Sequence, residues 1–214
     1  MIFKRKIEAK ITERLFKNRA ILIFGPRQAG KTTLFKEIIK SFGERAGYFN
    51  CELAAVRKNF VLGEPALLMN LVDGRELVVF DEAQTIENIG AILKVFIDTY
   101  PKVQIIATGS SSFDLANKIN EPLTGRAFEF TLYPLSLDEV KQNMAIDKTF
   151  LLELLRLGTY PAVVGERTAV IREDLLTNLA TNYLYKDIFI FESVRSPAVL
   201  EHLLKVIALQ VGST

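Results

Sequence analysis

The stretch AILIFGPRQAGKTTLFKEIIK, residues 20–40, decides the fold. It begins with an apolar run of strand length, passes through a loop with two glycines, and ends in apolar residues spaced as on one face of a helix. The loop, residues 25–32, matches the pattern G-x-x-x-x-G-K-[ST] at every fixed position. A strand before this loop and an amphipathic helix after it are the context that the pattern requires.

The chemistry of this loop predicts a site for the phosphates of a nucleoside triphosphate. Backbone N–H groups and the positive end of the helix dipole would face the phosphate oxygens. Gly30 would let the main chain come close, Lys31 would reach the β- and γ-phosphates, and the Thr32 hydroxyl would ligate magnesium. The alternative is a glycine turn that binds nothing. The predicted nucleotide-binding residues are Gly25, Pro26, Arg27, Gln28, Ala29, Gly30, Lys31, Thr32 and Thr33.

A second motif, ELVVFDEAQ at residues 76–84, ends an apolar run in two adjacent carboxylates. Unpaired charge at the end of a buried strand is costly, and a magnesium ion with a water nucleophile would explain both acids. Asp81 would hold the metal, usually through water, and Glu82 would orient and polarise the attacking water. A solvent-facing acidic turn is the alternative.

A third apolar run, VQIIATGSSS at residues 103–112, ends in hydroxyl side chains. If this strand lies between the strands of the first two motifs, Thr108 or Ser110 would project toward the γ-phosphate. We assign a catalytic sensing role to Ser110. A hydroxyl-rich turn that caps the next helix is the alternative.

The residues around these motifs favour adenine over guanine. Guanine-specific proteins typically carry Asp-x-x-Gly after the second motif, whereas Asp81 is followed by Glu-Ala-Gln. The segment NKIN, residues 117–120, lacks the final aspartate of the guanine-reading Asn-Lys-x-Asp motif. We therefore expect ATP, with magnesium.

The order of apolar and helical patterns predicts an α/β core with a mainly parallel sheet, followed by a helical part. We place the core at residues 1–134, with a basic N-terminal helix at 6–17, and the helical part at 135–214. The expected strands are 20–24, 46–51, 76–80, 103–108 and 127–132. Ser136 and Glu139 form a capping box at the start of the helical part. The chain stops in an apolar helical pattern, which suggests that a longer natural chain was cut here.

Composition and charge exclude several classes of protein. The formal net charge of +2 is too small to name a partner, but residues 1–19 carry seven basic side chains against two acidic ones. That segment would lie on DNA phosphates or form a solvated face. The single cysteine, Cys51, excludes an internal disulfide, and no apolar run has the length of a membrane span. We expect a cytoplasmic protein that does not enter a membrane. The single histidine, His202, has no cluster of ligating residues around it.

The motifs together resemble those of the AAA+ superfamily of ATPases. More narrowly, they resemble a group of bacterial and archaeal predicted ATPases that carry a winged-helix segment and a restriction-nuclease-like domain after the ATPase, parts that are absent here. The resemblance runs from about residue 14 to residue 212. The segments that carry it are GPRQAGKTT, LVVFDEAQ, IIATGSSS, LTGRAFEFTLYPLSLDEV and LLRLGTYPAVV.

The resemblance implies a sheet in the order 5-1-4-3-2 and a helical lid after residue 134. It implies that Glu82 activates water and that residues 108–110 form the first sensor. Arg126, in LTGRAF, falls where an arginine near a subunit interface is expected, and it would act as an arginine finger in a neighbouring protomer of a homo-oligomer. A surface arginine or a loop salt bridge is the alternative.

Two main hypotheses about function follow. In the first, the protein binds ATP and magnesium, hydrolyses the ATP slowly, and acts as a nucleotide-driven conformational switch coupled to DNA or to a partner protein. In the second, it is a nucleotide-gated binding or scaffold protein with negligible hydrolysis. A small-molecule kinase is a third possibility, although the arginine-rich lid usual in such enzymes is not evident in the sequence.

Overall fold

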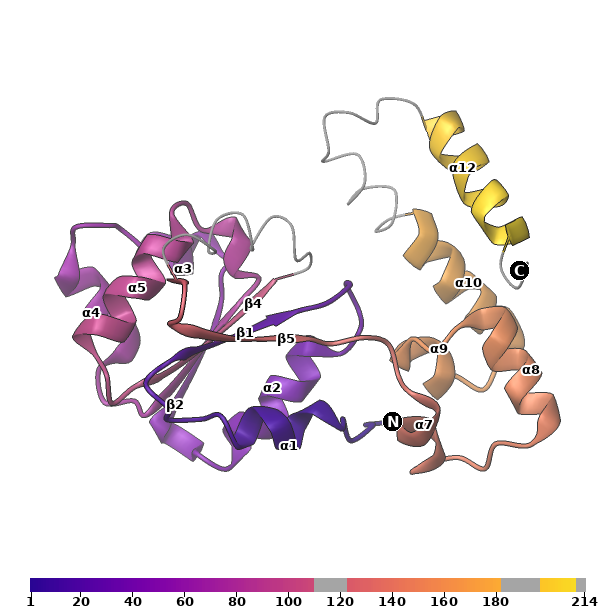
Figure 1. The fold of residues 1–214 in the computed structure, drawn as a ribbon, viewed down its shortest axis with the longest axis horizontal. Helices are drawn as coiled ribbons and strands as arrows, with labels where there is room; N and C mark the ends of the chain where they lie inside the picture. The colour runs from indigo at the N-terminus through magenta and orange to yellow at the C-terminus, as the bar shows by residue number, and fades with distance from the viewer. Residues whose placement is uncertain (110–122, 182–196, 211–214) are drawn as a thin grey trace. The chain divides into compact units, whose positions relative to one another are not determined.

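The computed structural model describes residues 1–109, 123–181 and 197–210. Its centre is a five-stranded sheet in which every neighbouring pair of strands is parallel (Figure 1). The order is β2-β3-β4-β1-β5, which confirms the expected order read from the other edge. The strands are β1 (Ala20–Phe24), β2 (Ala46–Asn50), β3 (Leu77–Asp81), β4 (Gln104–Gly109) and β5 (Ala127–Thr131).

Helices follow the strands along the chain, as in other α/β folds. Those between the strands and directly after β5 are α1 (Ile7–Thr12), α2 (Lys31–Lys40), α3 (Ala54–Arg57), α4 (Pro65–Val72), α5 (Ile89–Thr99) and α7 (Leu137–Lys141), with short 3-10 helices η1 (Gly43–Arg45) and η2 (Ala83–Thr85). The later helices are α8 (Lys148–Leu157), α9 (Pro161–Gly165), α10 (Ala169–Leu179) and α12 (Pro197–Gln210).

The three inner strands are buried along their whole length, because helices cover both faces of the sheet. Figure 1 shows α1 and α2 on one face and α4 and α5 on the other. On the α4–α5 face, Leu22 packs in a cluster with Phe80 and Phe96, whose ring centroids are 5.3 Å apart. On the α1–α2 face, Ile23 packs in a cluster with Phe35. This two-sided core fixes the carboxyl ends of the inner strands side by side.

The N-terminal helix is shorter than the range 6–17 that its periodicity predicts. It ends at Thr12, and the chain then turns through Phe16 and Asn18, which have left-handed φ values of 58° and 55°. The backbone N–H of Phe16 donates to the side-chain oxygen of Gln104 at 2.6 Å. This hydrogen bond to β4 replaces the one that a continuing helix would make, so the range 6–17 is corrected to Ile7–Thr12.

The chain divides into two compact units after Asp147, and not at residue 134. The first unit comprises Met1–Asp147 with Thr159–Pro161, and the second comprises Lys148–Gly158 with Ala162–Thr214. The capping box at Ser136 and Glu139 is present, as predicted. Helix α7 nevertheless belongs to the first unit, because its Glu139 side chain accepts a hydrogen bond of 2.7 Å from the backbone N–H of Lys6.

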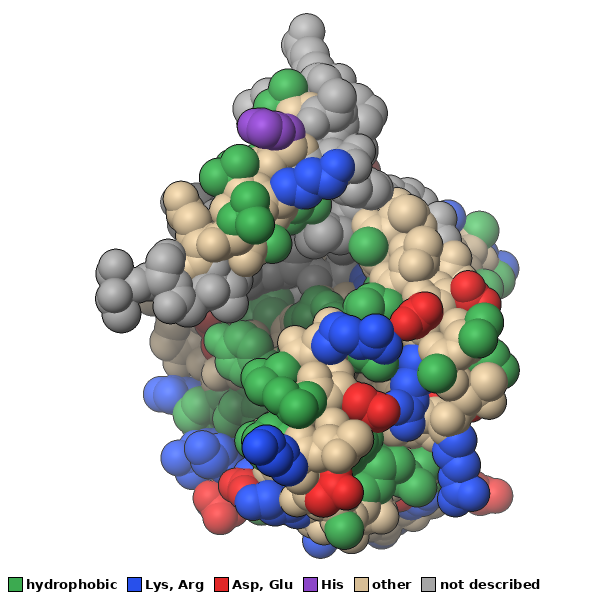
Figure 2. Space-filling view, turned by 90° about the vertical axis from the view of Figure 1, so that its right-hand side faces the viewer, with side chains coloured by type: hydrophobic (Ala, Val, Ile, Leu, Met, Phe, Trp, Pro, Cys, Tyr) green, Lys and Arg blue, Asp and Glu red, His purple; other side chains and the backbone are tan. Residues whose placement is uncertain are grey.

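In the second unit, α8 and α10 are joined by ion pairs on their surfaces. Arg172 on α10 lies 2.8 Å from Glu153 on α8, and Arg156 lies 3.1 Å from Glu173. Figure 2 shows hydrophobic side chains along α12, next to the single histidine, His202. The exposed apolar residues of α12 are Val199, Leu203, Val206, Ile207 and Leu209. Among the helices of the described ranges, none combines the length and the hydropathy that a membrane span requires.

Candidate functional site

The predicted phosphate loop joins the carboxyl end of β1 to the first turn of α2. Gln28 and Gly30 have left-handed φ values of 61° and 98°, so the loop turns sharply before the helix begins. Lys31, the first residue of α2, is buried, and its Nζ donates to the carbonyl oxygen of Gly25 at 2.9 Å and to that of Pro26 at 3.3 Å. The loop therefore folds around the lysine ammonium.

Gly25 is required by packing at the start of the loop. A Cβ atom added to it would lie 2.3 Å from the carbonyl oxygen of Leu132, which follows β5. The N–H of Leu132 donates to the carbonyl of Phe24 at 2.7 Å and holds the two backbones together. The sequence pattern identifies this glycine, but the reason that a larger residue does not fit there is a contact with Leu132, the residue directly after the last strand.

Asp81, at the end of β3, is the centre of a buried hydrogen-bond network. Its Oδ2 accepts hydrogen bonds from the Thr32 hydroxyl at 2.8 Å and from the Tyr48 hydroxyl at 2.6 Å. Its Oδ1 accepts a hydrogen bond from the Thr108 hydroxyl at 2.6 Å. The structure thus brings together Thr32 and Asp81, the two residues predicted to hold magnesium, and adds two further hydroxyl donors.

Glu82 lies next to this network in a left-handed conformation, with φ 54° and ψ 44°. Residues without glycine's freedom adopt this conformation rarely, and such strain is concentrated at functional sites. The Glu82 N–H donates to Thr108 Oγ1 at 3.1 Å, and its Oε2 accepts from Gln84 Nε2 at 2.5 Å. Its Oε1 lies 3.9 Å from Lys31 Nζ. The predicted catalytic pair, Lys31 and Glu82, is therefore together at the mouth of the loop.

Thr108 lies in β4, between β1 and β3, as the third motif requires. Its hydroxyl is wholly buried and touches the acidic pair, donating to Asp81 and accepting from Glu82. Ser110, the residue to which the sequence assigned the sensing role, lies outside the described residues. The Thr108 hydroxyl therefore forms hydrogen bonds with both acidic residues and helps to orient them.

Tyr48, on β2, is a site residue that the sequence motifs missed. Burial raises the pKa of its hydroxyl, and the hydrogen bond to Asp81 raises that pKa further, so the hydroxyl stays a donor at physiological pH. The available signal was weak: β2 is the neighbour of β3, and Asn50 lies opposite Asp81 in the register. Without the strand order, nothing distinguishes Tyr48 from a packed aromatic residue.

We predict that Tyr48→Phe lowers the melting temperature of the nucleotide-free protein by roughly 3–10 °C, because a hydrogen bond to a charged group contributes about 1.5–3 kcal/mol. The ring remains, so packing is kept and only the hydroxyl is lost. Tyr133→Phe is the matched control, since Tyr133 is 70% exposed. Equal melting temperatures for the two variants in a calorimetric scan would contradict the role given to the Tyr48 hydroxyl.

Cys51 is packed in the core and lies close to the acidic pair. Its backbone N–H donates to the carbonyl oxygen of Asp81 at 2.9 Å. Burial raises the pKa of the thiol to about 12, and the charges of Asp81 and Glu82 contribute to the shift. The thiol therefore stays protonated and acts as a small apolar side chain.

Arg126 lies far from the phosphate loop of its own chain. Its carbonyl accepts a hydrogen bond of 2.9 Å from the N–H of Ala20, at the start of β1, whereas the loop follows the end of that strand. Its Nε is 3.4 Å from Asp98 Oδ1, and both side chains are exposed. The role of Arg126 in a neighbouring protomer stays a prediction.

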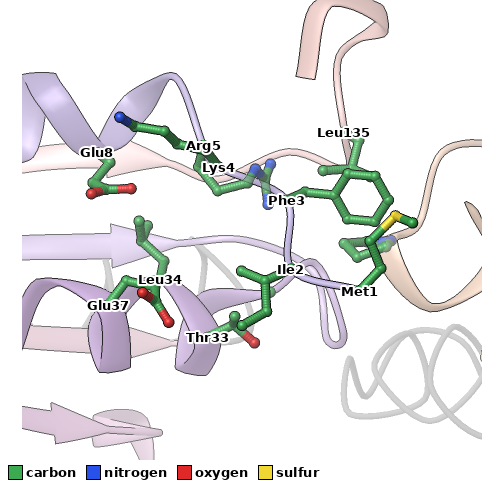
Figure 3. A pocket seen from close by; sticks show the side chains of 12 residues that line it. Met1, Ile2, Phe3, Lys4, Arg5, Glu8, Thr33, Leu34, Glu37 and Leu135 are labelled. Atoms are coloured by element: carbon green, nitrogen blue, oxygen red, sulfur yellow. The ribbon is translucent and has the colours of Figure 1, made fainter. Parts of the chain in front are cut away.

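A cavity of about 370 Å³ lies beside the first turn of α2. Figure 3 shows Thr33, Leu34 and Glu37 from α2 facing the N-terminal residues Ile2 to Glu8. Its size falls within the range of small-molecule sites, and apolar residues form much of its lining. No motif marks its N-terminal wall, so sequence reasoning missed it. The residues that line the cavity include Phe3, Gly30, Thr33, Leu34, Leu135 and Pro161.

Comparisons with known proteins show the family to which the chain is similar. A family model described as an AAA domain matches residues 17–141, more than half of the chain. An uncharacterized protein of Mycobacterium bovis and one of Mycobacterium tuberculosis are each 32% identical over 146 residues, which are 68% of this chain but only 32% of each relative's length. A solved Walker-type ATPase of Pyrococcus abyssi matches with a TM-score of 0.56 and 21% identity, over 76% of this chain and 65% of that one. This last likeness supports the fold.

Proposed function

The chain belongs to the family of AAA domains, and from that membership we propose that it binds ATP together with magnesium and hydrolyses the ATP slowly. One observation carries the proposal. The Thr32 hydroxyl and the Asp81 carboxylate lie 2.8 Å apart at a loop whose lysine ammonium is 3.9 Å from Glu82. A phosphate-binding cation, two hard oxygen ligands and a carboxylate for water are thus within reach of one another.

The loop would bind the β- and γ-phosphates through its backbone N–H groups and through Lys31. In the described structure the ammonium of Lys31 binds the carbonyl oxygens of Gly25 and Pro26. A phosphate oxygen is a stronger, charged acceptor, so we expect the ammonium to exchange these carbonyl contacts for the nucleotide.

The donor set fits magnesium. This ion binds oxygen and is usually held by one or two protein ligands together with phosphates and water. Thr32 and Asp81 would be those ligands, and the Tyr48 and Thr108 hydroxyls keep the carboxylate oriented. When bound, magnesium neutralises charge on the β- and γ-phosphate oxygens.

Glu82 would orient the attacking water and accept its proton. Gln84 donates a hydrogen bond to Oε2 of its carboxylate, and the Thr108 hydroxyl accepts a hydrogen bond from its backbone N–H. Oε1 faces Lys31, the residue that would hold the γ-phosphate. This leaves one carboxylate oxygen directed toward the place where water and phosphate would meet.

The cavity beside α2 is the proposed place of the nucleoside. It begins at Gly30 and Thr33, directly next to the phosphate loop. Apolar groups of Phe3, Leu34 and Leu135 offer surfaces for a purine ring. The base would be adenine, because the residues that follow Asp81 do not match the motif of guanine-specific proteins. Comparing the affinities for ATP and GTP tests this choice.

The proposed output is a nucleotide-driven change of conformation passed to DNA or to a partner protein, in a homo-oligomer in which Arg126 would act on the neighbouring nucleotide. The matched relatives are about three times longer than the segment they share with this chain, so the output of the whole protein is a separate proposal. Detectable phosphate release by the wild-type protein would exclude the alternative of a scaffold with negligible hydrolysis.

Titration calorimetry with ATP and with GTP, each with and without magnesium, tests the binding proposal. We expect ATP to bind more tightly than GTP, with magnesium strengthening the binding. Lys31→Ala should weaken ATP binding about 100-fold or more, since it removes the cation at the β- and γ-phosphates. Lys40→Ala is the matched control, because Lys40 is an exposed lysine at the other end of α2 that pairs with Glu37. Equal ATP affinity in wild type and Lys31→Ala would overturn the proposal.

A further inference from the structure

Arg5 is a buried arginine whose guanidinium binds three separate parts of the first unit. Its Nη1 donates to the carbonyl oxygen of Ala29, inside the phosphate loop, at 2.6 Å. Its Nη2 donates to the carbonyl oxygen of Tyr133, after β5, at 2.5 Å. Its Nε lies 3.2 Å from Glu139 Oε1, at the start of α7. One planar group therefore links the phosphate loop to residues 133–139.

The contact with Ala29 fixes the direction of a backbone N–H in the loop. In a planar trans peptide, the C=O of Ala29 and the N–H of Gly30 point in opposite directions. Because Arg5 holds the carbonyl on the outer side of the loop, the N–H of Gly30 is turned away from Arg5 and toward the inside. Arg5 also lies beside Gly30 itself, since a Cβ added there would be in van der Waals contact with Arg5 Nη1, at 3.4 Å.

The opposite end of the guanidinium is anchored by a carboxylate that is itself held firmly. Burial alone would raise the pKa of Glu139, but the backbone N–H groups of Ser136 and Lys6 and the charge of Arg5 hold that pKa below its usual value. Glu139 is therefore ionised at neutral pH, and both charges are nearly hidden from solvent. Removing one partner of a buried pair leaves the other charge uncompensated, so the two ends of this link depend on each other.

We propose that Arg5 is a positioning residue that couples the phosphate loop to residues 133–139, so that nucleotide bound in the loop stabilises that segment. This inference rests on the proposed nucleotide binding and names how the same site is regulated. The guanidinium is suited to the task because its donors lie in one rigid plane, so a shift of the Ala29 carbonyl moves the contacts with Tyr133 and Glu139 together. Residues 133–139 lead along the chain toward the second unit, which begins at Lys148.

Hydrogen exchange measured by mass spectrometry on the full chain, with and without ATP and magnesium, tests the coupling. In wild type, nucleotide should slow exchange in residues 26–33 and also in residues 133–139. In Arg5→Gln, nucleotide should still slow exchange in residues 26–33, with about tenfold weaker affinity, because one charge-assisted hydrogen bond is lost. The protection of residues 133–139 should fall to a minor part of its wild-type extent in this variant, since only direct contact of the nucleotide with Leu135 would remain.

Lys6→Gln is the matched control. Lys6 follows Arg5 in the chain, and its side chain pairs with Asp138, which lies on α7 next to Glu139. This ion pair is exposed and does not involve the phosphate loop. It should behave as wild type. A second variant, Glu139→Gln, removes the charge that compensates Arg5 and so weakens the link from its far end. It should lose most of the protection of residues 133–139 and weaken ATP binding less than Arg5→Gln does, because the guanidinium beside Ala29 is still present.

The outcomes separate two failures. If nucleotide does not protect residues 26–33 in folded wild-type protein, the proposed function fails and the coupling falls with it. If residues 26–33 are protected but residues 133–139 are not, the coupling alone is wrong. It is also wrong if Arg5→Gln, or Glu139→Gln where Arg5→Gln does not fold, keeps wild-type protection of residues 133–139.

Discussion

Glu82→Gln will release phosphate from ATP at least about 100 times more slowly than wild type while still binding ATP, because general-base catalysis contributes factors of this size. Glutamine cannot accept the proton of the attacking water, but it has the size of glutamate. Its side-chain oxygen can still accept the hydrogen bond from Gln84 that holds Glu82 Oε2. The left-handed backbone at residue 82 is equally available to both residues, so the fold should be unchanged.

Phosphate release under saturating ATP and magnesium, together with calorimetric ATP affinity, measures this effect. Glu87→Gln is the control: it makes the same chemical change at an exposed carboxylate of the same segment. Equal rates for wild type and Glu82→Gln would show that Glu82 does not activate water. If the wild type itself releases no phosphate but binds ATP tightly, the nucleotide-gated scaffold becomes the better account.

The parts of the site that sequence could predict are those whose chemistry is local. The phosphate loop needs a strand, two glycines, a lysine and a hydroxyl at fixed spacing, and all of these lie within residues 20–40. The acidic pair Asp81 and Glu82 follows directly from an apolar run that ends in two charges. Parallel strands then bring both motifs to one edge of the sheet, where the structure places Thr32 against Asp81.

The parts that sequence could not predict depend on contacts between distant segments. Tyr48 and Arg5 carry no motif, and each acquires its role from a strand or helix elsewhere in the chain. The end of α1 is another example, because the periodicity continues past Thr12 while the backbone of Phe16 is captured by Gln104. The division of the compact units after Asp147 has the same kind of cause, since the capping box of α7 binds back to the N-terminal segment.

The third motif shows an intermediate case. The sequence placed Thr108 or Ser110 near the nucleotide and assigned the sensing role to Ser110. The register settles the position of Thr108, which lies opposite Ile23 of β1 and donates to Asp81 on the other neighbouring strand. A one-residue shift would have turned this side chain to the other face of the sheet. Strand register, which sequence gives only weakly, therefore determines that the Thr108 hydroxyl reaches Asp81.

Gly25→Ala will destabilise the first unit strongly, with a melting temperature lower by about 6 °C or more. The added Cβ would lie 2.3 Å from the carbonyl oxygen of Leu132, a backbone atom that cannot rotate away. Overpacking costs about 1–3 kcal/mol and occasionally more, and a contact with a backbone atom belongs to the upper end of this range. At about 2–4 °C for each kcal/mol in a domain of this size, a cost of about 3 kcal/mol lowers the melting temperature by about 6 °C or more. Moving β5 away from β1 to relieve the contact would also lengthen the 2.7 Å hydrogen bond from Leu132 to Phe24.

Gly47→Ala separates this steric cause from a general intolerance of alanine in the sheet. A Cβ at Gly47 would also lie under 3.0 Å from its neighbours, at 2.6 Å from Arg75 Cδ and 2.9 Å from a ring carbon of Phe49. Those atoms belong to side chains that can shift, so its melting temperature should fall by less than half as much. Because Leu132 also leads into the segment held by Arg5, Gly25→Ala should weaken ATP binding, whereas Gly47→Ala should not. Equal melting temperatures and equal ATP affinities for the two variants would mean that the backbone of residue 132 is free to move, and that the loop does not depend on its contact with the end of β5.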